Sequence, residues 1–302
     1  MSGGGSTKVI IIAMMANLGI AVAKFVGAFI SGSASLLAEA IHSVVDTTNQ
    51  VLLLVGEKSA KKAPTEKHPL GYGRESFFWS FVVTVLLFSL GGLFAIYEGV
   101  HKMSDPEPIE NAPLVLGILG VGVLLEGFSF RAALKEIRAT NRFGSLGTWF
   151  RKTTSAGLLV IFTEDAGALL GLFMAAGCVG MAVVTGDPAW DAYGSILIGT
   201  LLVVLACFLA VEIKSLIIGE APAKNYRPAV ERILKERMPT AKLLRFLGLQ
   251  LGDRDVMLSY KIHPGNETDV NSLIQDINQV EAEVRHQFPE VKWQFVEPDY
   301  TE

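Results

Sequence analysis

Apolar residues along the chain gather in six long runs that are separated by short polar segments. The runs cover residues 9–30, 35–56, 76–100, 113–134, 158–185 and 193–218. Each run is long enough to cross the roughly 30 Å hydrocarbon layer of a bilayer as one α-helix. Half of all residues are hydrophobic, the mean hydropathy is +0.41 and only 19% are charged, unlike an ordinary soluble domain. We therefore predict a domain of six transmembrane helices over residues 1–218.

From residue 219 to residue 302 the pattern is that of a small soluble α+β domain. The segments "RPAVERILKERM" and "NSLIQDINQVEAEVRHQF" repeat apolar residues at helical spacing, whereas "FLGLQLG", "VMLSYKIH" and "VKWQFVE" alternate apolar and polar residues. The predicted order is helix, strand, strand, helix, strand. An open three-stranded sheet with helices on one face leaves an edge or a face to pair, so we expect this domain to form a homodimer.

The distribution of Lys and Arg predicts the orientation in the membrane. Positive residues favour cytoplasmic loops, and they gather after the second and fourth runs. These residues are Lys58, Lys61, Lys62, Lys67, Arg74, Lys135, Arg138, Arg142, Arg151 and Lys152. Residues 101–112 hold one Lys or Arg, which is Lys102, and residues 186–192 hold none, so both termini are expected in the cytoplasm. The first run has no cleavage site of a secretory signal, and the lack of a targeting segment favours a bacterial inner membrane.

Four polar residues interrupt the second run: Glu39, His42, Asp46 and Asn49. Their spacing of three, four and three places them on one face of a helix. A charged group at membrane depth costs about 2.5–3.5 kcal/mol, so such groups face a cavity, a partner or an ion. His42 and Asp46 lie one turn apart, where an imidazole nitrogen and a carboxylate can bind one cation. The alternative is a hydrogen-bonded pair that joins two helices.

Two adjacent acids, Glu164 and Asp165, lie early in the fifth run. They point about 100° apart around a helix axis, so only one of them can face a common centre squarely, and the other reaches its edge or a neighbouring helix. The alternative is that both extend to the membrane interface.

Together, His42, Asp46 and Asp165 offer one nitrogen and two carboxylates, with Asn49 or Glu164 for a fourth position. Such a borderline nitrogen and oxygen site suits Zn²⁺, and also Fe²⁺, Co²⁺ or Mn²⁺. Without metal the site gathers like charges at low dielectric, so it should hold protons and release them when metal binds. The ligands themselves therefore predict an exchange of protons for a divalent metal.

Other features narrow the possible functions. The chain has no G-x-x-x-x-G-K-[ST] loop and no H-E-x-x-H motif, which disfavours a nucleotide-driven pump, a metalloenzyme and a bound cofactor. Its net charge of −4 disfavours nucleic acid as a partner.

Moving a divalent cation out of the cell against an inside-negative potential costs about 4.6 kcal/mol per 100 mV, so we expect an inward proton flux to drive transport. A passive metal channel is the alternative from another class.

Further polar residues within the runs allow several interpretations. Asn17, Lys24, Glu98 and Glu126 are candidates for a proton path or for helix pairing. Asp187 and Asp191 fit the acid that is ordinary at a helix start.

Several motifs resemble the cation diffusion facilitators along nearly the whole chain. They are "SLLAEAIHSVVDTTNQ", "HPLGYGRE", the fifth-run "EDAGALLG" and the sixth-run "DAYGSILIG". The resemblance implies a six-helix metal/proton antiporter with a cytoplasmic, ferredoxin-like, metallochaperone-like domain. It implies Zn²⁺ export by alternating access in a homodimer, with His42, Asp46 and Asp165 as the transport site.

The sequence departs from this family at residue 161. Relatives usually carry His or Asp four residues before the fifth-helix aspartate, where this chain has Ile161. It resembles a branch in which Glu164 accompanies the aspartate, and we expect Glu164 or Asn49 to fill the gap. His42 matches the pattern of zinc-preferring relatives, while Fe²⁺, Co²⁺ and Mn²⁺ are alternative substrates.

Overall fold

The computed structural model describes residues 18–140, 144–266 and 269–301. It divides into two compact units. The helical unit falls within residues 1–55, 79–146 and 157–213, and the α/β unit within residues 56–78, 147–156 and 214–302. The α/β unit therefore contains the ends of several long helices as well as the predicted soluble domain. Part of the first predicted run, residues 9–17, lies outside the described residues.

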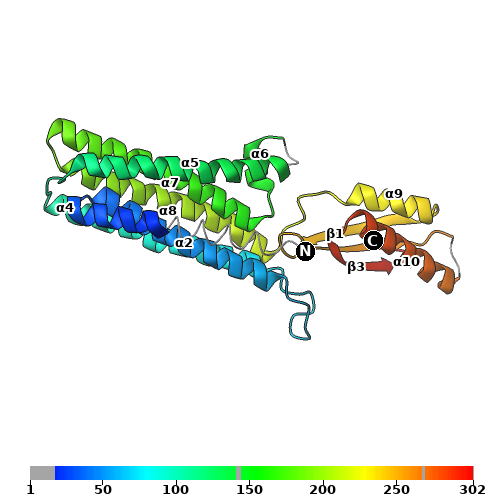
Figure 1. Ribbon diagram of the computed structural model, residues 1–302. Helices are drawn as coiled ribbons and strands as arrows, with labels where there is room; N and C mark the ends of the chain where they lie inside the picture. Colours follow the sequence, from blue (N-terminus) through cyan, green and yellow to red (C-terminus); the bar gives the residue numbers. More distant parts are fainter. Residues whose placement is uncertain (1–17, 141–143, 267–268, 302) are drawn as a thin grey trace. The chain divides into compact units, whose positions relative to one another are not determined.

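Long helices that lie side by side form the helical unit (Figure 1). The described part of the first helix is Leu18–Ser31. The other helices in this part of the chain are α2 (Ala34–Ala60), α3 (Glu75–Leu86), the π-helical segment η1 (Leu87–Leu93), α4 (Phe94–Ser104), α5 (Ala112–Thr140), α6 (Leu146–Lys152), α7 (Ala156–Thr185) and α8 (Ala189–Ile218). Helices α3, η1 and α4 are consecutive, and all six apolar runs are helical wherever they are described.

Four of the described helices are long and apolar enough to cross a membrane: Glu75–Ser104, Ala112–Ala139, Ala156–Thr185 and Ala189–Ile218. The described part of the first helix is shorter, and α2 has sufficient length but carries the polar face. A membrane protein with several apolar helices is thus established, and the number of six spans stays a prediction.

Glycines allow α8 to approach the third apolar run closely. A Cβ atom on Gly199 would lie 2.6 Å from the carbonyl oxygen of Gly92, and one on Gly99 would lie 2.8 Å from that of Ala192. Neither distance leaves room for a side chain, so the two backbones touch, as small residues permit between membrane helices. The adjacent Gly91 in η1 faces His42, whose Nδ1 is 4.0 Å from the position of a Cβ there.

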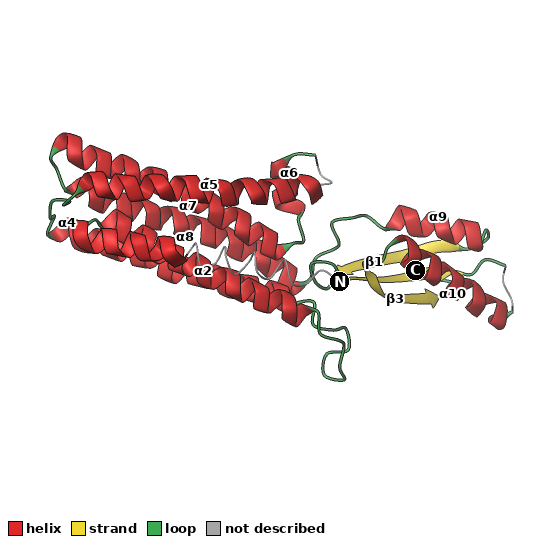
Figure 2. Cartoon of the chain, in the orientation of Figure 1, coloured by secondary structure: helices red, strands yellow, loops and turns green. Residues whose placement is uncertain are grey.

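Figure 2 shows the helices and strands of the α/β unit, and their order along the chain is the one that the sequence predicts. Its elements are α9 (Arg227–Arg237), β1 (Lys242–Gln250), β2 (Val256–His263), α10 (Val270–Gln287) and β3 (Val291–Pro298). The sheet order is β1-β2-β3, in which β1 and β2 are antiparallel and β2 and β3 are parallel. Helix α10 connects the two parallel strands, as parallel pairing requires.

Both helices of this sheet pack on one face of it. Every second residue of β2, from Val256 to Ile262, is buried in the same core as residues from α9 and α10, which are Val230, Ile233, Leu234, Val280 and Val284. On the other face Leu247 and Phe295 are about half exposed, at 53% and 51%, and both pair with Ser259 in the register of the sheet. The sheet therefore has an open face with exposed apolar side chains.

The turn between β1 and β2 contacts the helix ends that belong to the same unit. The α-carbon of Gly73 lies 2.8 Å from the position of a Cβ on Gly252. The Asp253 carboxylate accepts hydrogen bonds from Ser76 Oγ at 3.2 Å and Ser155 Oγ at 3.4 Å. Burial raises the pKa of Asp253 to about 6. The two hydrogen bonds and a third from the backbone N–H of Ala156 lower this pKa, but burial has the larger effect.

Candidate metal site

The four polar residues of α2 lie on its buried face, as their spacing predicts. Glu39 and Asn49 are fully buried and His42 is 1% exposed, while the Asp46 side chain is 16% exposed. These groups are held away from the outer surface of the helical unit, where a polar group in a membrane would face lipid. Their environments nevertheless differ along the helix.

Glu39 has a partner of opposite charge in the first helix. The ammonium group of Lys24, which is 1% exposed, lies 3.1 Å from Glu39 Oε2 and donates to Ser43 Oγ at 2.7 Å. A buried carboxylate is tolerated when it is paired and hydrogen-bonded. The pair therefore joins the first helix to α2, which resolves one of the possibilities left open for Lys24.

His42 and Asp46 lack such partners. His42 Nε2 lies 3.6 Å from Asp46 Oδ2, which exceeds hydrogen-bond length. Among the described residues, neither ring nitrogen of His42 makes a hydrogen bond, and Asp46 Oδ1 accepts none. Buried polar atoms are nearly always hydrogen-bonded, and an exception calls for an ion, a water or a functional role. A hydrogen-bonded structural pair does not describe this geometry.

The two acids of α7 diverge to different helices, as their 100° separation predicts. Asn49 Nδ2 of α2 donates to Glu164 Oε1 at 2.5 Å, and Ser129 Oγ of α5 donates to Asp165 Oδ2 at 2.9 Å. Glu164 and Asp165 are only 5% and 9% exposed, so they are packed inside the unit. Helices α2, α5 and α7 therefore all contribute polar groups to one region.

Helix α5 contributes two polar residues whose place in the site the sequence did not predict. Ser129 was not a candidate, because a single serine in an apolar run is common. Glu126 lies one turn before it and interacts electrostatically with His42, Asp46 and Asp165. Their spacing of three residues on a helix was the available signal, since it places both on one face.

The candidate ligands form neighbouring groups rather than a closed cage. Within residues 18–140, 144–266 and 269–301, no three His, Cys, Asp or Glu side chains lie close enough together to hold one metal ion. Ile161, one turn before Asp165, is half-buried and apolar. A cation that bridges His42, Asp46 and Asp165 therefore requires side chains or helices to move.

Asp191 forms a second buried polar cluster in the helical unit. Its carboxylate accepts from the Ser33 and Ser35 hydroxyls at 2.8 and 2.6 Å, and from the backbone N–H groups of Ala34 and Ser35 at 2.6 and 3.2 Å. Lys102 Nζ lies 3.0 Å away. The carboxylate thus caps the start of α2.

Asp191 lies in the first turn of α8, as expected, but its carboxylate also binds the backbone N–H groups at the start of α2. The Asp187 carboxylate binds at the start of α8, where its Oδ1 accepts from the backbone N–H of Ala189 at 2.9 Å. The contacts of Asp191 come from residues more than 80 positions away in sequence, which local patterns do not show.

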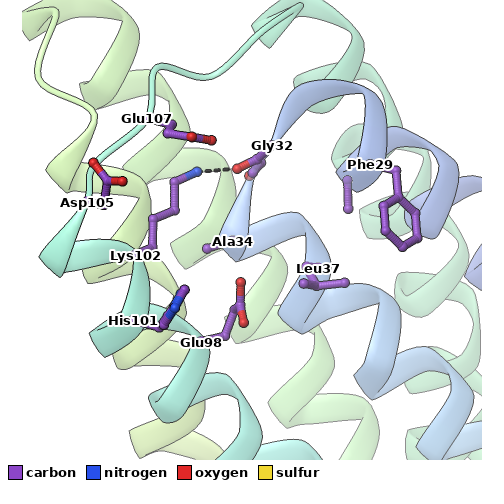
Figure 3. A pocket seen from close by; sticks show the side chains of 11 residues that line it. Phe29, Gly32, Ala34, Leu37, Glu98, His101, Lys102, Asp105 and Glu107 are labelled. Carbon is purple, nitrogen blue, oxygen red and sulfur yellow. Dashed lines mark hydrogen bonds between the residues drawn. The ribbon is translucent and has the colours of Figure 1, made fainter.

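A pocket of about 340 Å³ lies beside this cluster, between the end of the first helix, the start of α2 and α4 (Figure 3). Lys102 reaches across it to the carbonyl oxygen of Gly32, and Glu98 points toward the start of α2. Its lining includes Glu98, His101, Asp105 and Glu107, and none of the five predicted ligands. This pocket is separate from the candidate metal site.

Polar residues at the end of the α/β unit have ordinary partners. His263 Nδ1 accepts from the backbone N–H of Gly265 at 3.0 Å, and Lys261 Nζ pairs with Glu297 at 3.3 Å and Asp299 at 2.8 Å. These contacts fit a solvated surface at His263, Glu297 and Asp299.

Comparison with known proteins places the helical region in a family. A family model described as the cation efflux transmembrane domain matches residues 10–218. The chain is 33% identical over 219 residues to the protein named proton-coupled zinc antiporter SLC30A9, mitochondrial, of Xenopus laevis, covering 72% of this chain and 39% of that one. It is 32% identical over 218 residues to metal tolerance protein C4 of Arabidopsis thaliana, covering 72% and 48%. Zinc transporter ZitB of Pectobacterium atrosepticum is 30% identical over 112 residues, covering 37% and 35%.

The chain therefore belongs to the cation diffusion facilitator family, which confirms the resemblance found in its motifs. Members of this family are membrane transporters of metal cations. The match spans less than half the length of each of these three relatives, so the properties of their other parts do not carry over.

Proposed function

We propose that the protein is an antiporter that exchanges a divalent transition-metal cation, Zn²⁺ above all, for protons by alternating access. The observation that carries the proposal is the set of unpartnered atoms on α2. Both nitrogens of His42 and one oxygen of Asp46 are buried without hydrogen bonds in the described part of the chain. These are donor types that bind borderline cations.

His42, Asp46 and Asp165 are the proposed transport ligands, with Asn49 and Glu164 beside them. Nitrogen and oxygen donors suit Zn²⁺ and do not select the softer Cu⁺. The names of two relatives specify zinc, and one of them specifies proton coupling, which supports Zn²⁺ as the first substrate to test. Fe²⁺, Co²⁺ and Mn²⁺ are alternatives with similar ligand preferences.

Proton exchange follows from the charge of the site. Several carboxylates gathered at low dielectric repel one another, so protons neutralise them until a metal ion replaces those protons. Export of a divalent cation against 100 mV, inside negative, costs about 4.6 kcal/mol, which inward proton movement can supply. A rigid-body movement of helices would then expose the site to the two sides in turn.

The proposed assembly is a homodimer with six spans per protomer, a ferredoxin-like domain and both termini in the cytoplasm of a bacterial inner membrane. Support for dimerisation comes from the open sheet face, where Leu247 and Phe295 are exposed. Support for the orientation comes from the basic loops after the second and fourth runs.

The test is metal uptake into proteoliposomes that contain a dye for internal pH. Zn²⁺, Fe²⁺, Co²⁺, Mn²⁺ and Cd²⁺ are offered in turn to wild type and to Asp46→Ala. We expect Zn²⁺ uptake with opposite proton movement, and loss of both in the variant. Asp187→Ala is the matched control, because Asp187 is an exposed acid that caps its own helix.

Flux that does not depend on the proton gradient would instead favour a passive channel. Uptake that survives Asp46→Ala would refute the proposed site.

A further inference from the structure

Helix α5 presents one polar face to the candidate metal site. Residues 122, 126 and 129 are separated by four and three positions, so they share a face. The position of a Cβ on Gly122 is 3.6 Å from Lys24 Cε, and Ser129 donates to Asp165 at 2.9 Å. Glu126 lies between these two contact points, so its side chain starts on the face of α5 that meets the first helix and α7.

The outward face of α5 is different in character. Leu124 and Phe128, on either side of Glu126 in sequence, are 67% and 71% exposed, as expected of side chains that face lipid. Glu126 itself is half-buried. Its carboxylate interacts electrostatically with Asp46 of α2 and with both acids of α7.

Glu126 has neither a hydrogen bond nor an ion pair within the residues that the structure describes, whereas three other acids nearby have partners. Glu39 is paired with Lys24, Glu164 accepts from Asn49 and Asp165 accepts from Ser129. An acid at membrane depth without a partner marks a functional position. The unpartnered and 1% exposed ring of His42 is an independent sign of a ligand site in the same place.

We propose that Glu126 of α5 is the fourth metal ligand, and that it completes the set of His42, Asp46 and Asp165. This inference rests on the proposed function and identifies a donor that its three-residue site lacks. A zinc site with one nitrogen and three carboxylate oxygens reaches the preferred coordination of four. Asn49 Nδ2 donates to Glu164 Oε1, so these two side chains are tied to each other, and Asn49 Oδ1, which is buried without a hydrogen bond in the described chain, is the competing donor.

The assignment makes α5 part of the binding event. A metal ion held by groups from α2, α5 and α7 would draw these three helices together, and its release would free α5. Since no closed cage exists among the described residues, the approach of Glu126 is one of the movements that binding requires.

The test measures Zn²⁺ affinity by equilibrium binding of radioactive Zn²⁺ to the purified full-length protein in detergent. The variants are Glu126→Gln, Glu126→Asp and Glu164→Gln, with Glu98→Gln as a control. Glu98 is also a half-buried acid of an apolar helix, but it lines the separate pocket beside Lys102. Elution profile and melting temperature verify that each variant is folded.

We expect Glu126→Gln to weaken Zn²⁺ binding by more than about tenfold, because even groups that only support a ligand change affinity by about 10–100-fold. Glu126→Asp should recover part of the loss, since it keeps the carboxylate, and Glu98→Gln should bind as wild type does. Wild-type affinity in Glu126→Gln together with weak binding in Glu164→Gln would overturn the proposal and assign Glu164 instead.

Failure of the proposed function gives a different result. In that case Asp46→Ala binds and transports Zn²⁺ as wild type does, whatever the behaviour of Glu126→Gln. Loss of transport in Asp46→Ala with wild-type behaviour of Glu126→Gln would leave the antiporter intact and refute only the fourth ligand.

Discussion

The helical unit contains two buried polar clusters that differ in how completely they are satisfied. Around Asp191, five donor groups from the start of α2 and from Lys102 surround one carboxylate. Around His42 and Asp46, three buried donor or acceptor atoms have no hydrogen bond within the described chain. A buried cluster whose polar atoms all have hydrogen bonds is typical of a contact that holds helices together. A buried cluster whose polar atoms lack hydrogen bonds is typical of a site that binds a ligand.

The largest expected effect on stability follows from Asp191→Ala. This change removes the carboxylate that accepts from five donors, and it leaves the Lys102 ammonium, which is 8% exposed, without its ion-pair partner. Breaking a buried ion pair on one side costs about 3–5 kcal/mol. We expect a large fall in melting temperature and poor recovery of folded protein on size-exclusion chromatography. Wild-type stability would show that the cluster does not hold α2 in place.

Removal of Lys24 should have a slightly smaller effect, because fewer contacts are lost. Lys24→Met leaves Glu39, which is fully buried, as an unpaired carboxylate, at a cost of about 3 kcal/mol. The double variant Lys24→Met, Glu39→Gln removes both charges and should recover more than half of the lost stability. Equal instability of the single and double variants, measured by thermal melting, would contradict a direct pair.

Asp253 extends the comparison to the α/β unit, where a carboxylate is hydrogen-bonded but has no ion pair within the residues that the structure describes. Its pKa is raised from 3.8 to about 6 by burial, so the folded state binds the proton more tightly than the unfolded state. The resulting stabilisation is present below pH 4 and is lost as pH rises through about 6. With 1.36 kcal/mol per pKa unit, the loss is at most about 3 kcal/mol.

Asp253→Asn should abolish this pH dependence. We expect the melting temperature of wild type, relative to that of the variant, to fall between pH 4 and pH 7 and then to level off. A constant difference across this range would mean that Asp253 does not titrate there.

The smallest expected effect on stability is that of Asp46→Ala, although its effect on transport is the largest. Asp46 Oδ1 is buried without a hydrogen bond, so truncation removes a desolvation cost along with the side chain. We expect the stability to stay within about 1 kcal/mol of wild type while metal transport is lost. A loss as large as that of Asp191→Ala would erase the distinction between the two clusters.

Much of this arrangement was predictable from sequence because it depends on local periodicity. The spacing of 39, 42, 46 and 49 placed four polar groups on the buried face of α2, and the periodicity predicted the order of helices and strands along the α/β unit. The adjacency of Glu164 and Asp165 predicted that their side chains point in different directions. In the structure Glu164 is hydrogen-bonded to α2 and Asp165 to α5.

Partners between distant segments were not predictable in this way. Lys24 with Glu39, and Asp191 with Lys102, are contacts across 15 and 89 positions that depend on how helices cross. The π-helical segment η1 beside His42 has no sequence signature apart from its glycines. Glu126 was visible as an intramembrane acid, but its orientation toward Asp46 and Asp165 required the placement of α5.

The most direct measurement is zinc X-ray absorption on the full-length protein loaded with one equivalent of Zn²⁺, for wild type and His42→Gln. The wild-type spectrum should show only nitrogen and oxygen ligands at about 2.0–2.1 Å, including an imidazole. His42→Gln should lose the imidazole signal at the same metal loading. An imidazole signal that is unchanged in His42→Gln would show that zinc binds elsewhere, and that the unpartnered groups of α2 are not its ligands.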